Sequence, residues 1–166
     1  MADGLSEAET KDIEYQFGFH FPPDLRALLQ TGLPVGDWFP DWRGGDVARL
    51  ECDLNWPLEG MQFDIKNNAF WLGEWGPRPA SLADAFEVAA RAVAAAPRLI
   101  PVYSHRYIPA DPPKAGNPVF SVYQTDVIVY GADLLSYFAH EFHTVARWHT
   151  PPLDVRAIRF WGERAR

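Results

Sequence analysis

The chain has 166 residues, of which 48% are hydrophobic and 22% charged, the proportions of a soluble globular domain. Its formal net charge is −7, and the acidity is concentrated in residues 1–83, which contain 14 Asp and Glu against 6 Lys and Arg. Because nucleic acids and anionic membranes would repel such a chain, we expect neither as a partner.

The first third of the chain is predicted to be helical. Ser6 and Glu9 have the spacing of a capping box, and Gly18 would end the helix that they begin. Pro22 and Pro23 suit the first turn of a second, short helix that carries Leu25, Leu28 and Leu29 and stops at Gly32. Residues 33–45, rich in Gly and Pro, would follow as an ordered loop. A third, short helix is predicted over 47–54, because Pro57 stands directly after Asn55 and Trp56 and would end it.

The remaining two thirds mix strands and helices. The predicted elements are a short strand near 61–65, a helix over 81–96, a strand at 99–103, a long proline-rich connection at 108–118 and a hairpin of 119–123 and 127–130. A last helix begins at Asp133, and its predicted buried face contains Leu134, Leu135, Phe138, Phe142 and Val145. The tail at 155–161 is expected to be packed by Ile158 and Phe160. Helices and strands do not alternate regularly, so the pattern favours a single α+β domain.

The single cysteine, Cys52, excludes an intramolecular disulfide and a cysteine-rich metal site. We expect it to be a small buried residue, because Glu51 and Asp53 beside it would raise the pKa of a thiol. The segment Met1–Glu7 has no apolar stretch, and no run reaches the length of a membrane span, which favours a cytoplasmic protein.

The histidines and serines do not form a recognisable catalytic or metal-binding pattern. His140 and His143 are three residues apart, whereas the zinc-binding helix of metalloproteases needs a spacing of four. Ser104 and His105 are sequence neighbours without a nucleophile-elbow motif around them. We therefore expect no metal, no cofactor and no catalytic centre, although a pair of carboxylates for glycoside hydrolysis could be drawn from many acids.

The most unusual stretch is residues 37–75, in which tryptophans alternate with acids. Each tryptophan could be a core residue, but one or two left exposed among carboxylates would make an anchor for a protein partner. Trp38 and Trp42 are the best candidates for that anchor, and a sugar-stacking platform would use the same residues. The candidate partner-binding residues are Asp37, Trp38, Asp41, Trp42, Asp46, Asp53, Glu74 and Trp75.

Four segments, in this order, resemble the SUKH superfamily, or SMI/KNR-type domain. They are Phe21–Gly32, with its Pro-x-Asp start and closing Gly; Leu99–Tyr103, with its Ile-Pro-Val core; Gly116–Tyr123, with a Gly-Asn turn before a strand; and the helix Asp133–Phe142. The resemblance spans residues 6–143 and leaves 144–166 as a C-terminal extension. The chain departs from the family in its tryptophan-rich loops and in a longer, proline-rich 104–115.

The resemblance implies a central mixed or antiparallel sheet flanked by helices, without a catalytic centre. Bacterial members look like immunity proteins that neutralise toxins, and fungal members like regulatory scaffolds of the cell wall. An acidic face would associate faster with a basic toxin domain through electrostatic steering. We therefore expect an immunity protein whose partner is a basic toxin; a regulatory scaffold is the alternative, and a small hydrolase or sugar-binding protein is a third hypothesis.

Overall fold

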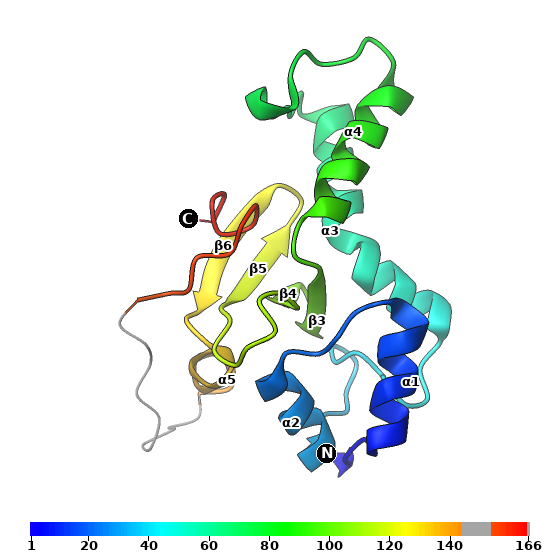
Figure 1. Ribbon diagram of the computed structural model, residues 1–166, viewed down its shortest axis with the longest axis vertical. Helices are drawn as coiled ribbons and strands as arrows, with labels where there is room; N and C mark the ends of the chain where they lie inside the picture. Colours follow the sequence, from blue (N-terminus) through cyan, green and yellow to red (C-terminus); the bar gives the residue numbers. More distant parts are fainter. Residues whose placement is uncertain (144–153, 166) are drawn as a thin grey trace.

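The computed structural model describes residues 1–143 and 154–165 and shows helices first, then a four-stranded antiparallel sheet, then a last helix (Figure 1). The elements are β1 (Ala2–Asp3), α1 (Glu7–Phe17), α2 (Pro23–Thr31), β2 (Gly32–Leu33), α3 (Val47–Asn67), the 3₁₀ turn η1 (Gly73–Trp75), α4 (Leu82–Ala95), β3 (Leu99–Tyr103), β4 (Arg106–Pro109), β5 (Val119–Tyr123), β6 (Asp126–Gly131) and α5 (Leu134–Glu141). The predicted single α+β domain is confirmed.

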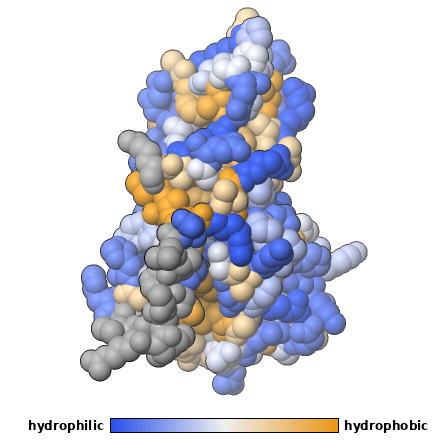
Figure 2. All heavy atoms as spheres, turned by 60° about the vertical axis from the view of Figure 1, so that its left-hand side comes forward, coloured by the Kyte–Doolittle hydropathy of each residue, from blue (hydrophilic) through white to orange (hydrophobic). Residues whose placement is uncertain are grey.

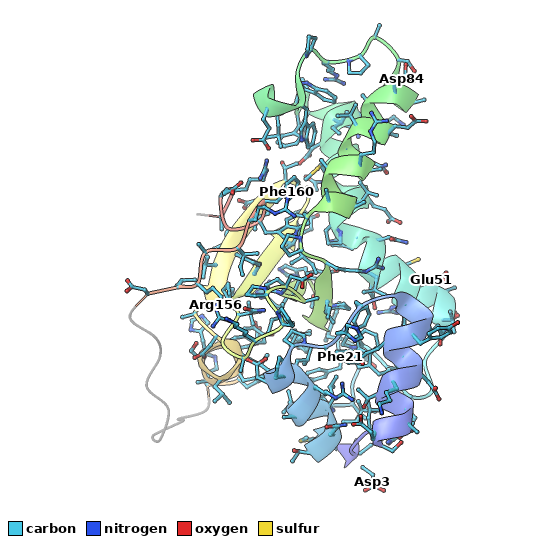
Figure 3. The ribbon with its side chains drawn as sticks, viewed as in Figure 1. Asp3, Phe21, Glu51, Asp84, Arg156 and Phe160 are labelled. Atoms are coloured by element: carbon cyan, nitrogen blue, oxygen red, sulfur yellow. The ribbon has the colours of Figure 1, made fainter. Side chains whose placement is uncertain are left out.

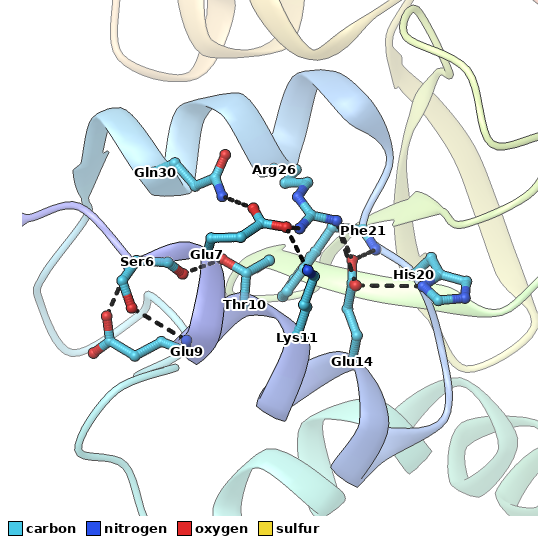
Figure 4. Close-up of polar contacts among 10 residues, drawn as sticks. All are labelled: Ser6, Glu7, Glu9, Thr10, Lys11, Glu14, His20, Phe21, Arg26 and Gln30. Carbon is cyan, nitrogen blue, oxygen red and sulfur yellow. Dashed lines mark hydrogen bonds and ion pairs between the residues drawn. The ribbon is translucent and has the colours of Figure 1, made fainter.

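The first two helices are joined by charged side chains (Figure 4). The capping box at the start of α1 is confirmed: Glu9 N–H donates to Ser6 Oγ over 3.2 Å, and Ser6 N–H donates to Glu9 Oε2 over 2.7 Å. Further along α1, Glu7 and the buried Glu14 both bind Arg26 of α2, at 2.8 and 3.3 Å. These contacts hold α1 against α2 at one end of the molecule.

Helix α3 is a single helix of 21 residues, so the predicted short helix over 47–54 and strand near 61–65 are wrong. Pro57 lies inside the helix and lacks the N–H that would donate to the carbonyl of Asp53. Tyr107 of β4 replaces that donor, since its hydroxyl donates to the Asp53 carbonyl over 2.8 Å. A side chain 50 residues further along the chain thus satisfies the backbone group that the proline leaves open.

Tyr107→Phe is expected to lower the free energy of unfolding by about 1–2 kcal/mol, because the Asp53 carbonyl would lose its donor in a partly buried place. Urea unfolding measures this loss. Tyr15→Phe is the matched control, since Tyr15 on α1 is almost fully exposed. Equal stability of the two variants would show that the hydroxyl does not support α3.

The sheet has the order β3-β4-β5-β6, and all its neighbouring strands are antiparallel. Strand β4 was not predicted: its last two residues were assigned to the 108–118 connection because of the prolines there. Pro109 stands at the end of β4, where it leaves the pairing of Arg106 and Tyr107 with β5 intact. The predicted hairpin is confirmed as β5 and β6.

The sheet separates two hydrophobic cores. Tyr107 and Ile108 are neighbours on β4 and enter different cores, as the alternation of a strand requires. One core packs the sheet against α1, α2, α5 and the first half of α3; the other packs it against the second half of α3, α4 and the C-terminal tail. Because both faces are covered, β3 and β4 are buried almost throughout.

Helix α5 begins at Asp133 as predicted, with the side chain accepting the N–H of Ser136. Its buried face differs from the prediction: Leu135 and Phe142 are exposed, and Tyr137 is fully buried. The helix presents Leu134, Tyr137 and Phe138 to the core, so Leu134 and Phe138 are placed as predicted and Tyr137 was missed. Val145 lies outside the described residues.

The described part of the C-terminal tail, residues 154–165, packs onto the second core. Ile158 and Phe160 are buried as predicted, and Figure 3 shows Phe160 between the sheet and α4. Trp161 is also buried, and its indole N–H donates to the carbonyl of Pro97 over 2.7 Å. The tail therefore covers the core beside β3.

Helices α3 and α4 form an antiparallel hairpin that extends beyond the sheet at one end of the molecule (Figure 1). On the face in Figure 2, hydrophobic residues reach the surface in patches separated by hydrophilic ones. Among helices in the described ranges, none combines the length and the apolar character needed to cross a bilayer.

Candidate functional site

Trp42 is 5% exposed and cannot be the predicted surface anchor. Its ring meets those of Phe17, Phe19 and Phe21 at centroid distances of 5.2–6.3 Å, with edge-to-face geometry at interplanar angles of 70–88°. The loop that carries it folds inward between α1 and α2, and three phenylalanines from that region cover the indole. The expectation for Trp42 is thus corrected: it is a core residue.

Glu74 and Trp75 lie in η1, in the connection from α3 to α4, far along the projecting hairpin. Trp75 packs edge-to-face on Trp71 at 5.1 Å, and Glu74 forms an ion pair with Arg164 of the tail. Both side chains have partners elsewhere in the protein, and the structure does not bring them together with the other candidate residues.

Asp41 and Asp46 are exposed, but their carboxylate oxygens organise the local backbone. Asp41 Oδ1 accepts the N–H of Gly44 over 3.0 Å, and Asp46 caps α3 by accepting the N–H of Ala48 over 2.9 Å. The formal charges of exposed aspartates act at a distance on an approaching partner. They contribute to the field of this surface without being direct contacts of a pocket.

Trp38 and Asp53 are brought together in a pocket of about 290 Å³, which we call the aromatic pocket. Its walls come from the loop before α3, from α3 itself, from β3, β4 and the turn that joins them, and from the end of β5. The aromatic side chains are Trp38, Phe39, Trp56, Tyr107 and Tyr123, and the charged or polar ones include Arg49, Asp53, Ser104 and His105. Trp38, Trp56 and Tyr123 are 62%, 41% and 56% exposed, so three large rings border an open cavity.

One face of α3 builds the floor of this surface. Asp46, Arg49, Asp53 and Trp56 follow one another at spacings of three and four residues, which places them along the same side of a helix. Trp56 shares this face because α3 continues through Pro57 instead of ending before it. The predicted candidates Asp46 and Asp53 thus share a face with Trp56, and Asp37 is exposed in the chain next to Trp38.

The loop segment with Trp38 is held from both sides. The N–H of Ser104, in the β3–β4 turn, donates to the carbonyl of Trp38 over 2.7 Å. The next residue, Phe39, lies between Tyr103 and Phe142, at centroid distances of 4.7 and 5.9 Å. The backbone of Trp38 is therefore fixed while its indole stays exposed.

The opposite wall is also fixed. The indole N–H of Trp56 donates to the carbonyl of Val122 over 3.3 Å, and its ring lies 6.3 Å from that of Tyr123. The ring of His105 also lies 6.3 Å from that of Tyr123, in edge-to-face geometry. These contacts connect α3 to β5 beside the cavity.

The pocket contains one pair of opposite charges, Asp53 and Arg49, which are not in hydrogen-bond contact. Burial raises the pKa of Asp53, and Arg49 is its ion-pair partner at 3.8 Å from Nε to Oδ2. Burial and the neighbouring Arg106 lower the pKa of His105, so its ring is neutral at pH 7. Near neutral pH the pocket therefore has one carboxylate inside and one exposed guanidinium at its edge.

Ser104 and His105 form a hydrogen bond of 3.1 Å between Oγ and Nδ1, which their adjacency in the sequence did not predict. A serine nucleophile needs an imidazole that is itself oriented by a third group. The carboxylate of the pocket, Asp53, instead contacts Arg49. With exposed rings and fixed walls, the arrangement is suited to binding a side chain.

Two other sequence features lie outside the pocket. Cys52 is exposed, contrary to the expectation that it is buried, because it lies on the outer side of α3. Within residues 1–143 and 154–165, no group of three or more His, Cys, Asp and Glu is placed to hold a metal ion. His140 packs edge-to-face on Tyr130 at 5.2 Å.

Sequence reasoning missed Trp56, Tyr123 and Arg49 as parts of the site. Trp56 belongs to the acidic and aromatic stretch, but the proline after it indicated a helix end. Tyr123 stands at the end of a strand more than 60 residues away, and no local pattern connects the two. No family model, no curated protein and no solved structure matches this chain.

Proposed function

We propose that this chain is a non-catalytic, cytoplasmic protein-binding domain that uses the aromatic pocket and its acidic surroundings to bind and neutralise a basic protein. The observation that carries the proposal is the group of three exposed rings, Trp38, Trp56 and Tyr123, held by backbone hydrogen bonds around the carboxylate of Asp53. Large aromatic side chains in such positions provide most of the binding energy in many protein interfaces.

The charge of the chain supports a basic partner. The net charge is −7, and Asp37, Asp41 and Asp46 are exposed on the loop that leads into the pocket. A field of one sign speeds the approach of an oppositely charged protein. An immunity protein that blocks a basic toxin would use both the exposed aromatic rings and the acidic surface, and the resemblance to the SUKH superfamily agrees with that role. A regulatory scaffold would use the same surface to bind a partner that is not toxic.

Trp38→Ala is expected to weaken binding of the basic partner by at least about 30-fold, because an exposed indole at the pocket edge would be lost from the interface. The measurement is titration calorimetry against the protein encoded by the adjacent gene. Tyr15→Ala is the control, since Tyr15 is an exposed aromatic residue on α1 outside the pocket. Equal affinity of the wild type and Trp38→Ala would refute the proposed surface.

The same titration at low and high salt separates the alternatives. A basic protein is expected to bind more weakly as salt rises, because the attraction between opposite charges is screened. A neutral oligosaccharide stacked on Trp38 and Trp56 would bind without that dependence. Growth after co-expression then distinguishes the two protein partners, since an immunity protein rescues cells from its partner and a scaffold has no toxicity to relieve.

A further inference from the structure

The carboxylate of Asp53 has unused hydrogen-bonding capacity. Its side chain is 34% exposed, and within residues 1–143 and 154–165 its charged partner is Arg49, whose Nε lies 3.8 Å from Oδ2, beyond hydrogen-bond distance. An ionised carboxylate can accept about four hydrogen bonds. Arg49 is 67% exposed, so its attraction to Asp53 is weakened by water. A partly buried carboxylate in this state favours a donor that enters from outside.

Three partly exposed aromatic rings border the same cavity as Asp53. Trp56 and Tyr123 are 6.3 Å apart and are fixed to each other through the Val122 carbonyl, while Trp38 borders the cavity from the loop. The face of an aromatic ring attracts a cation, and tryptophan does so most strongly. The neutral His105 adds no positive charge that would oppose a cation at neutral pH.

We propose that the aromatic pocket binds one arginine side chain of the partner, an inference that rests on the proposed function. The guanidinium of that arginine stacks on Trp38 or Trp56 and donates hydrogen bonds to the carboxylate of Asp53. Arginine fits better than lysine for two reasons. Its planar group stacks on aromatic rings, and its donors can bind both oxygens of a carboxylate at once. The incoming guanidinium displaces Arg49, whose side chain is largely exposed and can turn into solvent.

The test uses blocked tripeptides Gly-Arg-Gly, Gly-Lys-Gly and Gly-citrulline-Gly, since citrulline has the shape of arginine without its charge. The readout is the indole N–H resonances of Trp38 and Trp56 during an NMR titration. The arginine peptide is expected to shift both resonances to saturation, and the lysine peptide to bind about 5-fold more weakly. The citrulline peptide is expected to give no saturable shift. Equal binding of the arginine and citrulline peptides would overturn the proposal.

Two substitutions at the pocket have opposite expected effects. Asp53→Asn keeps the size of the side chain and removes its charge, and should weaken the arginine peptide by at least about 10-fold. Arg49→Gln removes the competing cation and should tighten binding about 2- to 5-fold. Asp84→Asn is the control, because Asp84 lies on α4 at the far end of the projecting hairpin (Figure 3). Unchanged affinity in Asp53→Asn, or weaker binding in Arg49→Gln, would contradict the assignment.

The two proposals fail in different ways. If the partner protein binds and loses affinity in Trp38→Ala but not in Asp53→Asn, the protein-binding surface stands and the arginine assignment is wrong. If the arginine peptide saturates the pocket but no basic protein binds, the assignment stands and the proposed function is wrong.

Discussion

Asp64→Ala is expected to lower the free energy of unfolding by about 2–4 kcal/mol at neutral pH, one of the largest losses expected of a single polar side chain in this protein. Asp64 is a buried residue near the end of α3. It accepts hydrogen bonds from the N–H and the hydroxyl of Thr125 at 3.0 and 2.6 Å, and from the side chain of Asn68 at 2.5 Å. Alanine would leave the donors of the β5–β6 turn without their acceptor.

The loss is expected to depend on pH. Burial acts to raise the pKa of Asp64, but the hydrogen bonds from Thr125 and Asn68 outweigh it and hold the pKa below the ordinary value. The stabilisation is therefore complete above the pKa of an aspartate in the unfolded chain, about 3.9, and is lost as the pH falls through the lower folded value. Urea unfolding at neutral and acidic pH should show the difference between wild type and Asp64→Ala narrowing in acid.

Asp12→Ala is the control for this series, because Asp12 is an exposed aspartate within α1. Its effect is expected to stay within about 0.5 kcal/mol at neutral pH. A difference between wild type and Asp64→Ala that stayed constant down to acidic pH would show that the loss came from packing and not from the charged hydrogen bonds.

Gly60→Ala is expected to destabilise the protein by about 1–3 kcal/mol, although alanine in a helix is ordinarily about 1 kcal/mol better than glycine. A methyl group on Gly60 would lie 2.7 Å from the Cα and 3.1 Å from the N of Gln124. Those are backbone atoms of the β5–β6 turn, so no side-chain rotation can relieve the contact. The helix or the turn would have to move apart.

Thermal or urea unfolding measures this effect, with Gly73→Ala as the matched control. A methyl group on Gly73 meets no atom within 4 Å, so its replacement should change stability by less than about 0.5 kcal/mol. A more stable Gly60→Ala variant would mean that helix propensity outweighs the contact and that the turn does not press on α3.

Local signals in the sequence predicted much of this fold. The caps at Ser6 and Asp133 and the turn between β5 and β6 depend on a few neighbouring residues, and all are confirmed. The error at α3 has a different origin. A proline normally ends a helix, and nothing near Pro57 reveals that Tyr107 supplies a donor to the Asp53 carbonyl. Strand β4 was missed for a related reason. Pro109 indicated a loop, but it stands at the end of the strand, where no backbone N–H is needed for pairing with β5.

The candidate site could be predicted only in part. Trp38 and Trp42 lie in one loop with similar neighbours, yet three phenylalanines cover Trp42 whereas the β3–β4 turn fixes only the backbone of Trp38. The composition of the loop predicted an exposed tryptophan among acids, but only the tertiary packing shows that it is Trp38 and not Trp42. Tyr123, in the wall opposite Trp38, belongs to a strand, and no pattern in the sequence indicates how close that strand lies to α3.

Helix α3 carries one wall of the aromatic pocket in its first half and binds the β5–β6 turn in its second half, through Gly60 and Asp64. The same turn follows directly after Tyr123, whose ring lies beside that of Trp56. The placement of Tyr123 relative to α3 is thus set by the folding of the chain, before any partner arrives. Association then requires little ordering of the site, so its entropic cost is carried mainly by the partner, and the encounter rate is governed by charge and orientation.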